Sequence, residues 1–306
     1  MRVFFAAPSR LWDEWSPALR AACPEMELCR DGDPASFDAL IYAPGYPDTG
    51  EPMDFRPFTR ARVVQSLWAG VERIVGNKTL TQPLCRMVDP GLAQGMAEWC
   101  LGWTMRLHLG MDRYLQDGQW RNGLVPPLAS ERPVTILGMG ELGRAVAEKL
   151  QGAGFPVTGW SASGRAVPGI RVLGADALPQ ALEGAEILIS LLPDTPGTWN
   201  LLDAQRLAML PQGAFLLNPG RGTVLDDEAL LAALDEGRLA HAVLDVFRTE
   251  PLPPGHPFWA HPGVTVTPHI AADTRPATAA PVAAENLRRA MEGRPLLHLV
   301  DRTRGY

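Results

Sequence analysis

The sequence contains few cysteines, and their spacing does not suit a common metal site. Only four occur in 306 residues, at positions 23, 29, 85 and 100. No two of them form a CxxC pair, and no Cys/His spacing suits zinc. We therefore expect free thiols and no bound metal.

The sequence also lacks an excess of basic charge and a long apolar run. Lys and Arg number 28 against 34 Asp and Glu, which gives a formal net charge of −6. Because nucleic-acid binding needs a clustered basic face, we expect no nucleic-acid partner. No apolar stretch reaches the roughly 18 residues that a membrane helix requires.

The N-terminal segment is too short for the apolar core of a secretory signal. Before Pro8 it holds one basic residue and only six apolar or small ones. We expect this segment to form a first strand, and the protein to be soluble and cytoplasmic, without membrane contact.

The composition and length indicate an ordinary globular protein of two domains. Hydrophobic residues make up 46% and charged residues 20% of the chain, and 306 residues suit two domains of about 150 residues each. The second half alternates apolar runs, typical of strands covered on both faces, with helical patterns. The runs are VTILG (134–138), VTGW (157–160), ILISLL (187–192), AFLLN (214–218), AVLDVF (242–247) and VTVTPH (264–269), and the helical patterns cover 142–154 and 226–239. This order predicts a doubly wound parallel sheet.

The first hundred residues repeat the alternation less regularly. Expected strands cover 3–7, 39–43, 63–68 and 73–75, which indicates a second, smaller α/β domain. We expect a long helix over 91–120, and a C-terminal helix over 276–293 that could cross back to the first domain. The predicted fold class is therefore α/β, with two Rossmann-like or flavodoxin-like domains. They are a discontinuous substrate domain, 1–98 plus 272–306, and a dinucleotide-binding domain, 99–271.

A glycine motif follows the first strand of the second half. Gly138, Gly140 and Gly143 form GxGxxG in ILGMGELGRAV, between an expected strand and an expected helix. That setting allows a tight turn, a close approach of the backbone to a pyrophosphate, and free N–H groups at the helix start. We expect the whole loop to bind a dinucleotide, including the intervening Met139, Glu141 and Leu142.

The next strand ends without the acidic residue that is typical of NAD sites. An Asp or Glu is expected about 20 residues on, where it binds the ribose hydroxyls, whereas Ser161 stands there in VTGWSASGR. Ser161, Ser163 and Arg165 would offer donors and a cation to a 2′-phosphate, or they could simply belong to a solvated loop. The pattern favours NADP(H), with NAD(H) possible.

Polar side chains also follow three later strands, where ligands bind in such sheets. They are Arg221 after AFLLN, Asp245 and Glu250 after AVL, and His269 at the end of VTVTP. Each has a simpler interpretation: Arg221 as a turn residue paired with a surface acid, Glu250 as a solvated loop residue, and His269 as a core histidine.

Together these residues suit one reaction. A guanidinium can hold the carboxylate of a 2-oxo acid in a bidentate pair and polarise its carbonyl group. Histidine can deliver the proton that accompanies hydride transfer to that carbonyl. Glu250 beside His269 would favour the imidazolium form and orient the ring. The set predicts an anion clamp (Arg221), an orienting carboxylate (Glu250) and a general acid (His269).

Five segments carry a family resemblance: ILGMGELG, LLPDTPGTWNLL, LLNPGRGTVLDDEALLAAL, AVLDVFRTEPLPPGHPFW and VTVTPHIA. In this order they resemble the D-isomer-specific 2-hydroxyacid dehydrogenases over residues 134–272. Within that family, WSAS, SLWAGVERIV (66–75) and the chain length are most similar to bacterial glyoxylate/hydroxypyruvate reductases of the A type.

The resemblance implies roles for individual residues. The family's catalytic Arg, Glu and His fall on Arg221, Glu250 and His269, of which the Arg and His also contact substrate. Its cofactor contacts outside the glycine loop fall on Leu192, Pro193 and Asp245, the last at the nicotinamide carboxamide, and we add Asn218 and Pro219 to the expected cofactor contacts.

A substrate loop is also implied, in the first domain. The family loop whose backbone N–H groups hold the substrate carboxylate falls on Trp68, Ala69 and Gly70. Many members have Gly where Trp68 stands, so we expect a narrower pocket that favours a short substrate side chain.

The family likeness further implies an activity and an assembly. In the family, the cofactor domain is inserted into the substrate domain, an active-site cleft lies between them, and members are commonly homodimers. The implied activity is NADPH-dependent reduction of small 2-oxo acids, glyoxylate to glycolate and hydroxypyruvate to D-glycerate. A broader D-2-hydroxyacid, phosphonate or formate dehydrogenase is an alternative. A nucleotide-sensing, corepressor-like protein is another, although a sensor has no need of a proton donor.

The expected helix over 91–120 is a candidate dimer interface because it is apolar and rich in tryptophan. Its tryptophans, Trp99, Trp103 and Trp120, could equally pack the two lobes together.

Overall fold

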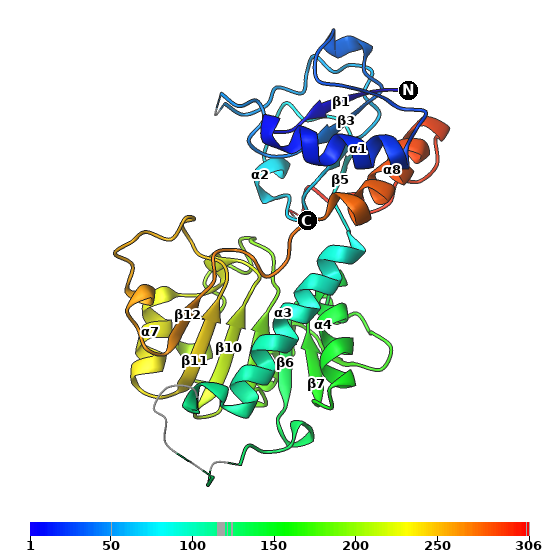
Figure 1. Ribbon diagram of the computed structural model, residues 1–306. Helices are drawn as coiled ribbons and strands as arrows, with labels where there is room; N and C mark the ends of the chain where they lie inside the picture. The colour runs from blue at the N-terminus through cyan, green and yellow to red at the C-terminus, as the bar shows by residue number, and fades with distance from the viewer. Residues whose placement is uncertain (50, 115–119, 121, 124, 304, 306) are drawn as a thin grey trace. The chain divides into compact units, whose positions relative to one another are not determined.

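The fold is taken from a computed structural model (Figure 1). It describes residues 1–49, 51–114, 120, 122–123, 125–303 and 305. The chain divides into two compact units, Met1–Leu92 with Asp273–Tyr306, and Ala93–Ala272. The first unit is therefore discontinuous in sequence. The sequence predicts divisions after residues 98 and 271, a few residues from these.

The first unit contains five parallel strands in the order β2-β1-β3-β4-β5, which is the flavodoxin-like order. The strands are β1 (Arg2–Ala6), β2 (Glu27–Cys29), β3 (Ala39–Tyr42), β4 (Val64–Ser66) and β5 (Leu84–Cys85). The helices are α1 (Trp12–Ala22), α2 (Glu72–Val75) and α8 (Pro276–Glu292). Every residue of β3 is buried, as expected for a strand with both faces covered.

Helix α8 returns the C-terminal part of the chain to the first unit. It packs against α1 and β4, and Figure 1 shows it (orange) beside α1 (blue). Its buried face is mostly alanine, which allows a close approach, and consists of Ala279, Ala280, Ala283, Ala284, Asn286, Leu287 and Ala290. Burial of this face stabilises the attachment of the C-terminal segment.

One strand expected in the first unit is wrong. Residues 73–75 belong to α2, in which Ile74 is buried and Arg73 is exposed. A three-residue apolar run carries no periodicity that distinguishes a strand from a helix. The strands β2 and β5 were not expected, since they are only 3 and 2 residues long.

The second unit contains seven parallel strands in the order β12-β11-β10-β9-β6-β7-β8. The strands are β6 (Val134–Leu137), β7 (Val157–Trp160), β8 (Arg171–Leu173), β9 (Ile187–Ser190), β10 (Ala214–Asn218), β11 (Leu239–Leu244) and β12 (Val264–Val266). The helices are α3, which begins in the first unit (Pro90–Leu109), α4 (Glu141–Gly152), α5 (Leu178–Glu183), α6 (Ala204–Leu207) and α7 (Asp227–Asp235). The chain order reverses between β6 and β9, a switch point where ligands bind in such sheets. The predicted α/β fold with two doubly wound parallel sheets is thus confirmed.

Several elements of the second unit end earlier than the sequence predicts. Strand β11 ends at Leu244 and β12 at Val266, where the pairing between them stops. The polar residues that follow therefore lie in loops beyond the carboxyl edge of the sheet. Helix α3 ends at Leu109, before the expected residue 120, and residues 115–119 of that expected helix lie outside the described residues. Strand β8 was not expected.

Helix α7 has a capping residue at its start and a glycine just past its end. The side chain of Asp226 accepts a hydrogen bond from the Ala229 N–H at 3.0 Å, and Gly237, just past the helix, has a φ of +71°. Left-handed backbone at that position favours glycine, so the helix ends where the sequence places its stop signal.

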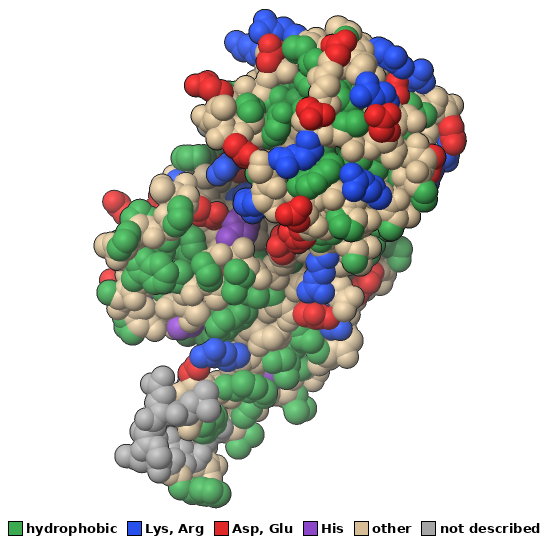
Figure 2. Space-filling view, turned by 45° about the horizontal axis from the view of Figure 1, so that its top comes forward, with side chains coloured by type: hydrophobic (Ala, Val, Ile, Leu, Met, Phe, Trp, Pro, Cys, Tyr) green, Lys and Arg blue, Asp and Glu red, His purple; other side chains and the backbone are tan. Residues whose placement is uncertain are grey.

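The surface of the first unit mixes the two signs of charge. Figure 2 shows acidic and basic side chains interspersed over its visible face. Within the described part of the chain, no helix is both long and apolar enough to cross a membrane.

Candidate active site

The glycine loop follows β6 and opens α4. Gly138 has a φ of +102°, and a Cβ atom there would lie 2.6 Å from the carbonyl oxygen of Leu191. A Cβ at Gly143 would collide with the carbonyl oxygen of Gly138, whereas nothing lies within 4 Å of one at Gly140. Two of the three glycines are therefore required by packing, and the third borders open space at the start of α4.

The start of α4 suits a pyrophosphate group. Gly140 is the N-cap residue, and no side chain caps the helix there, so its first N–H groups are available to an anion. Glu141 pairs with Arg144 rather than with the backbone. The Met139 side chain is buried beside Gly159 of β7, so Met139 can offer a dinucleotide only its backbone. Leu142 packs partly against the core.

A turn rich in hydroxyl groups follows β7. Ser161 Oγ lies 3.4 Å from Ser163 Oγ, and the Arg165 N–H donates to Ser163 Oγ at 3.4 Å. Gly164 has a φ of +59°, which tightens the turn, and the side chains of Ser163 and Arg165 are exposed. No acidic residue occurs in 161–165. These donors and this cation fit the 2′-phosphate of NADP better than the ribose diol of NAD.

The loops after β9 and β10 pack backbone against backbone. A Cβ at Gly220 would lie 2.8 Å from the Ser190 carbonyl oxygen and 3.1 Å from the Leu192 nitrogen. Leu192 is buried, and the carbonyl of Pro193 accepts the Thr198 hydroxyl at 2.6 Å. The glycine at 220 therefore allows the two loops to come into contact.

The turn that presents Arg221 is held by Asn218, the last residue of β10. The buried Asn218 amide donates to the Arg221 carbonyl at 3.1 Å and accepts the Gly220 N–H at 3.3 Å. Pro219 is buried, and Arg221 is half-buried and donates to the Gly220 carbonyl at 2.7 Å. Asn218 thus shapes the turn that presents Arg221, and its expected contact with a cofactor stays a prediction.

Glu250 and His269 form a hydrogen-bonded pair beyond β11 and β12. His269 Nδ1 lies 2.7 Å from Glu250 Oε2, and the Phe247 N–H donates to Glu250 Oε1 at 2.9 Å. The carboxylate is therefore fixed at both oxygens. His269 has a φ of +54°, which is unusual for a residue other than glycine, and its side chain is half-exposed. Because Nδ1 meets the carboxylate, Nε2 is the nitrogen left for a substrate.

Asp245 holds the segment that carries His269. Its carboxylate is fully buried and accepts the Thr267 hydroxyl at 2.5 Å, the Ile270 N–H at 3.0 Å and the Ala271 N–H at 2.9 Å. The His269 N–H also donates to the Asp245 carbonyl at 2.9 Å. These bonds support the loop, and the contact with the nicotinamide carboxamide that the family likeness implies stays a prediction. Thr267 is a supporting residue that the sequence analysis missed, because a threonine at a strand end carries no distinct signal.

The sheet explains why these residues share one edge. Strands β10, β11 and β12 are adjacent and parallel, so the loops after them, which carry Arg221, Glu250 and His269, all emerge at the carboxyl edge. The glycine loop after β6 and the hydroxyl turn after β7 emerge at the same edge. A nucleotide site and a cation, carboxylate and imidazole set thus lie along one side of a single sheet.

The expected substrate loop belongs to the first unit. Trp68, Ala69 and Gly70 follow β4 and are half-buried. The Trp68 N–H donates to Ser66 Oγ at 3.0 Å, and its carbonyl accepts the Met87 N–H at 3.0 Å. This loop also lies beyond the carboxyl end of a parallel strand.

Known proteins are similar to this chain in both sequence and fold. The model for the NAD binding domain of D-isomer specific 2-hydroxyacid dehydrogenases matches residues 100–271. Glyoxylate/hydroxypyruvate reductase A of Serratia proteamaculans is 38% identical over 321 residues, which covers 100% of both chains. A D-isomer specific 2-hydroxyacid dehydrogenase of Xanthobacter autotrophicus, solved with NADPH and MES, is 38% identical with a TM-score of 0.92 and covers 100% of this chain and 99% of its own.

A second solved structure is also similar to this chain over its whole length. The NADPH-dependent glyoxylate/hydroxypyruvate reductase of Sinorhizobium meliloti, in complex with NADP and sulfate, is 33% identical with a TM-score of 0.87, over 100% of this chain and 99% of its own. The match extends over both units and does not stop at the nucleotide-binding part. The chain belongs to the D-isomer specific 2-hydroxyacid dehydrogenases, a family of NAD(P)-dependent oxidoreductases.

Proposed function

We propose that the protein reduces small 2-oxo acids with NADPH, glyoxylate to glycolate and hydroxypyruvate to D-glycerate. The observation that carries this proposal is the Glu250–His269 hydrogen bond of 2.7 Å, at the sheet edge where the Arg221 loop also emerges. Similarity to two glyoxylate/hydroxypyruvate reductases, from Serratia and Sinorhizobium, supports the choice of substrates.

The proposed cofactor is NADP(H), with NAD(H) possible. The open space at Gly140 and the uncapped start of α4 would receive the pyrophosphate, and Ser161, Ser163 and Arg165 the 2′-phosphate. Leu192, Pro193 and Asp245 would lie along the rest of the nucleotide. When bound, NADPH supplies a hydride from C4 of its nicotinamide.

The chain's own residues would hold the substrate and move the proton. Arg221 would bind the substrate carboxylate and polarise the carbonyl group. His269 Nε2 would donate a proton to the carbonyl oxygen, while Glu250 keeps the ring in place through Nδ1. We further propose that Trp68, Ala69 and Gly70 bind the substrate carboxylate, with the indole limiting side-chain size.

One assay tests the reaction and the cofactor together. Oxidation of NADPH is followed by absorbance with glyoxylate, hydroxypyruvate, pyruvate and phenylpyruvate, and then repeated with NADH. We expect turnover with the two small acids, and a higher kcat/KM with NADPH. Faster turnover of phenylpyruvate would favour a broader dehydrogenase, and no turnover of any acid would contradict the proposal and favour a nucleotide sensor.

We also propose that the protein is a cytoplasmic homodimer. All four cysteines are free thiols, which suits a reducing compartment. For the dimer, the support is apolar exposure beyond the end of α3, where Trp120, Val125 and Leu128 are 92%, 87% and 69% exposed. Trp99 and Trp103 are only half-buried themselves but pack against the core of the second unit.

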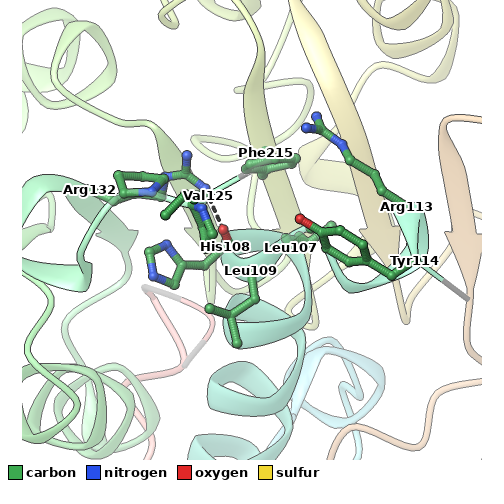
Figure 3. Close-up of a pocket in the computed structure, with 11 residues that line it drawn as sticks. Leu107, His108, Leu109, Arg113, Tyr114, Val125, Arg132 and Phe215 are labelled. Atoms are coloured by element: carbon green, nitrogen blue, oxygen red, sulfur yellow. Dashed lines mark hydrogen bonds between the residues drawn. The ribbon is translucent and has the colours of Figure 1, made fainter. Parts of the chain in front are cut away.

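A pocket adjoins one of these exposed side chains, that of Val125. Figure 3 shows Phe215 of β10 in this pocket, with Arg132 and Val125 on one side of it and Arg113 and Tyr114 on the other. The cavity is about 140 Å³, enough for an apolar side chain of a second copy. Single exposed apolar residues need no partner, but three of them between positions 120 and 128, one of which lines a cavity, favour an interface.

Sedimentation equilibrium tests the dimer. The wild type is expected at twice the chain mass, and the double variant Val125→Asp/Leu128→Asp at or near the chain mass, because buried carboxylates oppose association. Leu299→Asp is the matched control, since Leu299 is 59% exposed in the first unit. A monomeric wild type, or an unchanged double variant, would contradict the proposed interface.

A further inference from the structure

Arg248 lies between Phe247 and Glu250 in the loop after β11, where the Phe247 N–H donates to Glu250. Its side chain reaches three other segments. Its guanidinium donates to the side-chain oxygen of Asn200 and to the carbonyl of Leu225. Its Nε lies 3.4 Å from Asp227 Oδ1. Its Cζ lies 5.2 Å from the centre of the Trp199 ring. One side chain thus connects the loops after β9, β10 and β11.

The connected loops are those of the candidate active site. Leu225 is four positions beyond Arg221 in the loop after β10, and Arg248 is two positions before Glu250 in the loop after β11. A Cβ atom at Gly222 would collide with the Phe247 carbonyl carbon and lie 2.5 Å from the Arg248 nitrogen. The two loops therefore touch through their backbones at the point where Arg248 joins them.

The contacts of Arg248 are partly withdrawn from water. The side chains of Arg248 and Asp227 are each 26% exposed, so their interaction is screened less than a surface pair. Burial holds the pKa of the Asp227 carboxyl above its usual value, although the charges of Arg248 and His256 act to lower that pKa. A guanidinium can serve several acceptors at once because its N–H groups form a rigid fork, which a lysine ammonium lacks.

Asn200 gives this network a fixed second anchor. Its φ of +48° is left-handed, and its N–H donates to the Thr223 carbonyl at 2.9 Å. Residue Leu202 forms a bridge with Leu225 in the same region. The loop after β9 is therefore already attached to the loop after β10, and Arg248 attaches the Glu250 loop to both.

We infer that Arg248 is a positioning residue for Glu250. It holds the 245–251 segment against the 199–202 and 222–227 segments, so that the Glu250 carboxylate stays aligned with both the Phe247 N–H and His269 Nδ1. This inference rests on the proposed function, because Glu250 matters only if His269 acts on a substrate. Arg248 itself touches neither proton donor nor acceptor in the reaction.

The main test is Arg248→Met, which keeps an apolar stem and removes every donor. With NADPH and glyoxylate, kcat is expected to fall by about 10- to 100-fold, the scale of a small misplacement of reacting groups. Arg248→Lys keeps the charge and some donors and should recover part of that loss. Arg288→Met is the matched control, because Arg288 also bonds one carboxylate and one carbonyl, those of Glu25 and Ala22, and belongs to the first unit.

A double-mutant cycle separates positioning from a general structural role. If Arg248 acts through Glu250, then Arg248→Met should change kcat by no more than about twofold in a Glu250→Gln background. If it only stabilises the fold, the two losses should multiply. Multiplying losses, or a kcat of Arg248→Met within about twofold of wild type, would overturn the inference.

Hydrogen exchange gives a readout that needs no turnover. Amides of 245–250 are expected to exchange faster in Arg248→Met than in wild type and in Arg288→Met, since the Phe247 N–H bond to Glu250 becomes intermittent. Unchanged exchange of these amides in Arg248→Met would overturn the inference, and this comparison needs no turnover. Absence of turnover with every acid would instead contradict the proposed function. If Arg248→Met does not fold, judged by circular dichroism, Arg248→Lys carries the same cycle and the same exchange comparison.

Discussion

Individual side chains in this protein have their surroundings set by loops from different strands. Glu250 receives one hydrogen bond from its own segment, from the Phe247 N–H, and one from the segment after the next strand, at His269. The Asp245 carboxylate likewise accepts three hydrogen bonds from residues 267–271. Residue-scale predictions therefore concern how one loop holds another.

Replacement of His269 by alanine should remove the proton donor. We expect kcat for glyoxylate reduction to fall by about 10²- to 10⁴-fold, the usual contribution of general acid catalysis. His261→Ala is the matched control, since His261 also pairs with a carboxylate, Asp235 at 3.2 Å, but precedes β12 at the other edge of the sheet. Equal rates for His269→Ala and wild type would exclude His269 from the reaction.

Asp245→Asn should destabilise the fold although it conserves shape. In either orientation of the new amide, its NH₂ group would oppose a backbone N–H of Ile270 or Ala271, and a buried donor would lose its partner. We expect the free energy of unfolding to fall by about 1–3 kcal/mol, measured by urea denaturation. Asp273→Asn, at an exposed site, should change it by less than about 0.5 kcal/mol. An equally stable Asp245→Asn protein would count against the supporting role.

At the scale of elements, long apolar strands were predictable and short ones were not. Strands β6, β7 and β10 lie within a residue of their predicted bounds, because continuous apolar runs between turn residues leave few other structures. Residues 73–75 form part of a helix instead, and the three-residue β8 was missed. In these short segments the neighbouring elements decide the backbone conformation, and no local periodicity records that choice.

Asp89 joins the starts of two helices that the sequence separates by nearly two hundred residues. It is 1% exposed and accepts the N–H groups of Gly91 at 2.9 Å, Leu92 at 3.1 Å and Arg275 at 3.1 Å. The first two belong to the first turn of α3, and Arg275 is the N-cap of α8. One carboxylate therefore fixes both places where the chain leaves and re-enters the first unit.

Asp89→Ala should cost more stability than loss of an ordinary helix cap. We expect the free energy of unfolding to fall by about 2–4 kcal/mol, since a cap is lost and a buried N–H of a second helix loses its acceptor. The comparison is Asp226→Ala, which removes the cap hydrogen bond from the Ala229 N–H and should cost about 1 kcal/mol. Equal costs for the two variants would show that the Arg275 bond contributes nothing.

For the molecule as a whole, burial lowers the reactivity of the four cysteine thiols. Burial raises the pKa of the Cys23 thiol to about 11 and that of Cys85 to about 12, and it also raises the pKa of the fully buried Cys100 thiol. Cys29 is partly exposed, and burial together with Glu27 raises its pKa as well. Thiols that stay protonated react slowly, because the thiolate is the nucleophile.

Titration with a chromogenic disulfide reagent at pH 8 tests this. In the native protein we expect at most one slowly reacting thiol, that of Cys29, and four reacting thiols after denaturation in guanidinium chloride. The variant Cys29→Ser should then show no reaction in the native state. Rapid reaction of two or more native thiols would contradict the packing described for Cys23, Cys85 and Cys100.

The sequence by itself determined the fold class, the glycine loop and the candidate set of Arg221, Glu250 and His269. Apolar runs and the turn residues after them are local, and parallel strands bring such ends to one edge whatever the details. The tertiary structure decided what those residues contact. It gave Gly222 its reason, contact with the backbone of Phe247 and Arg248, and it made Asp245 and Arg248 supports of neighbouring loops. Such contacts join residues more than twenty positions apart, so their physical cause, the packing of one loop against another, is absent from any local pattern.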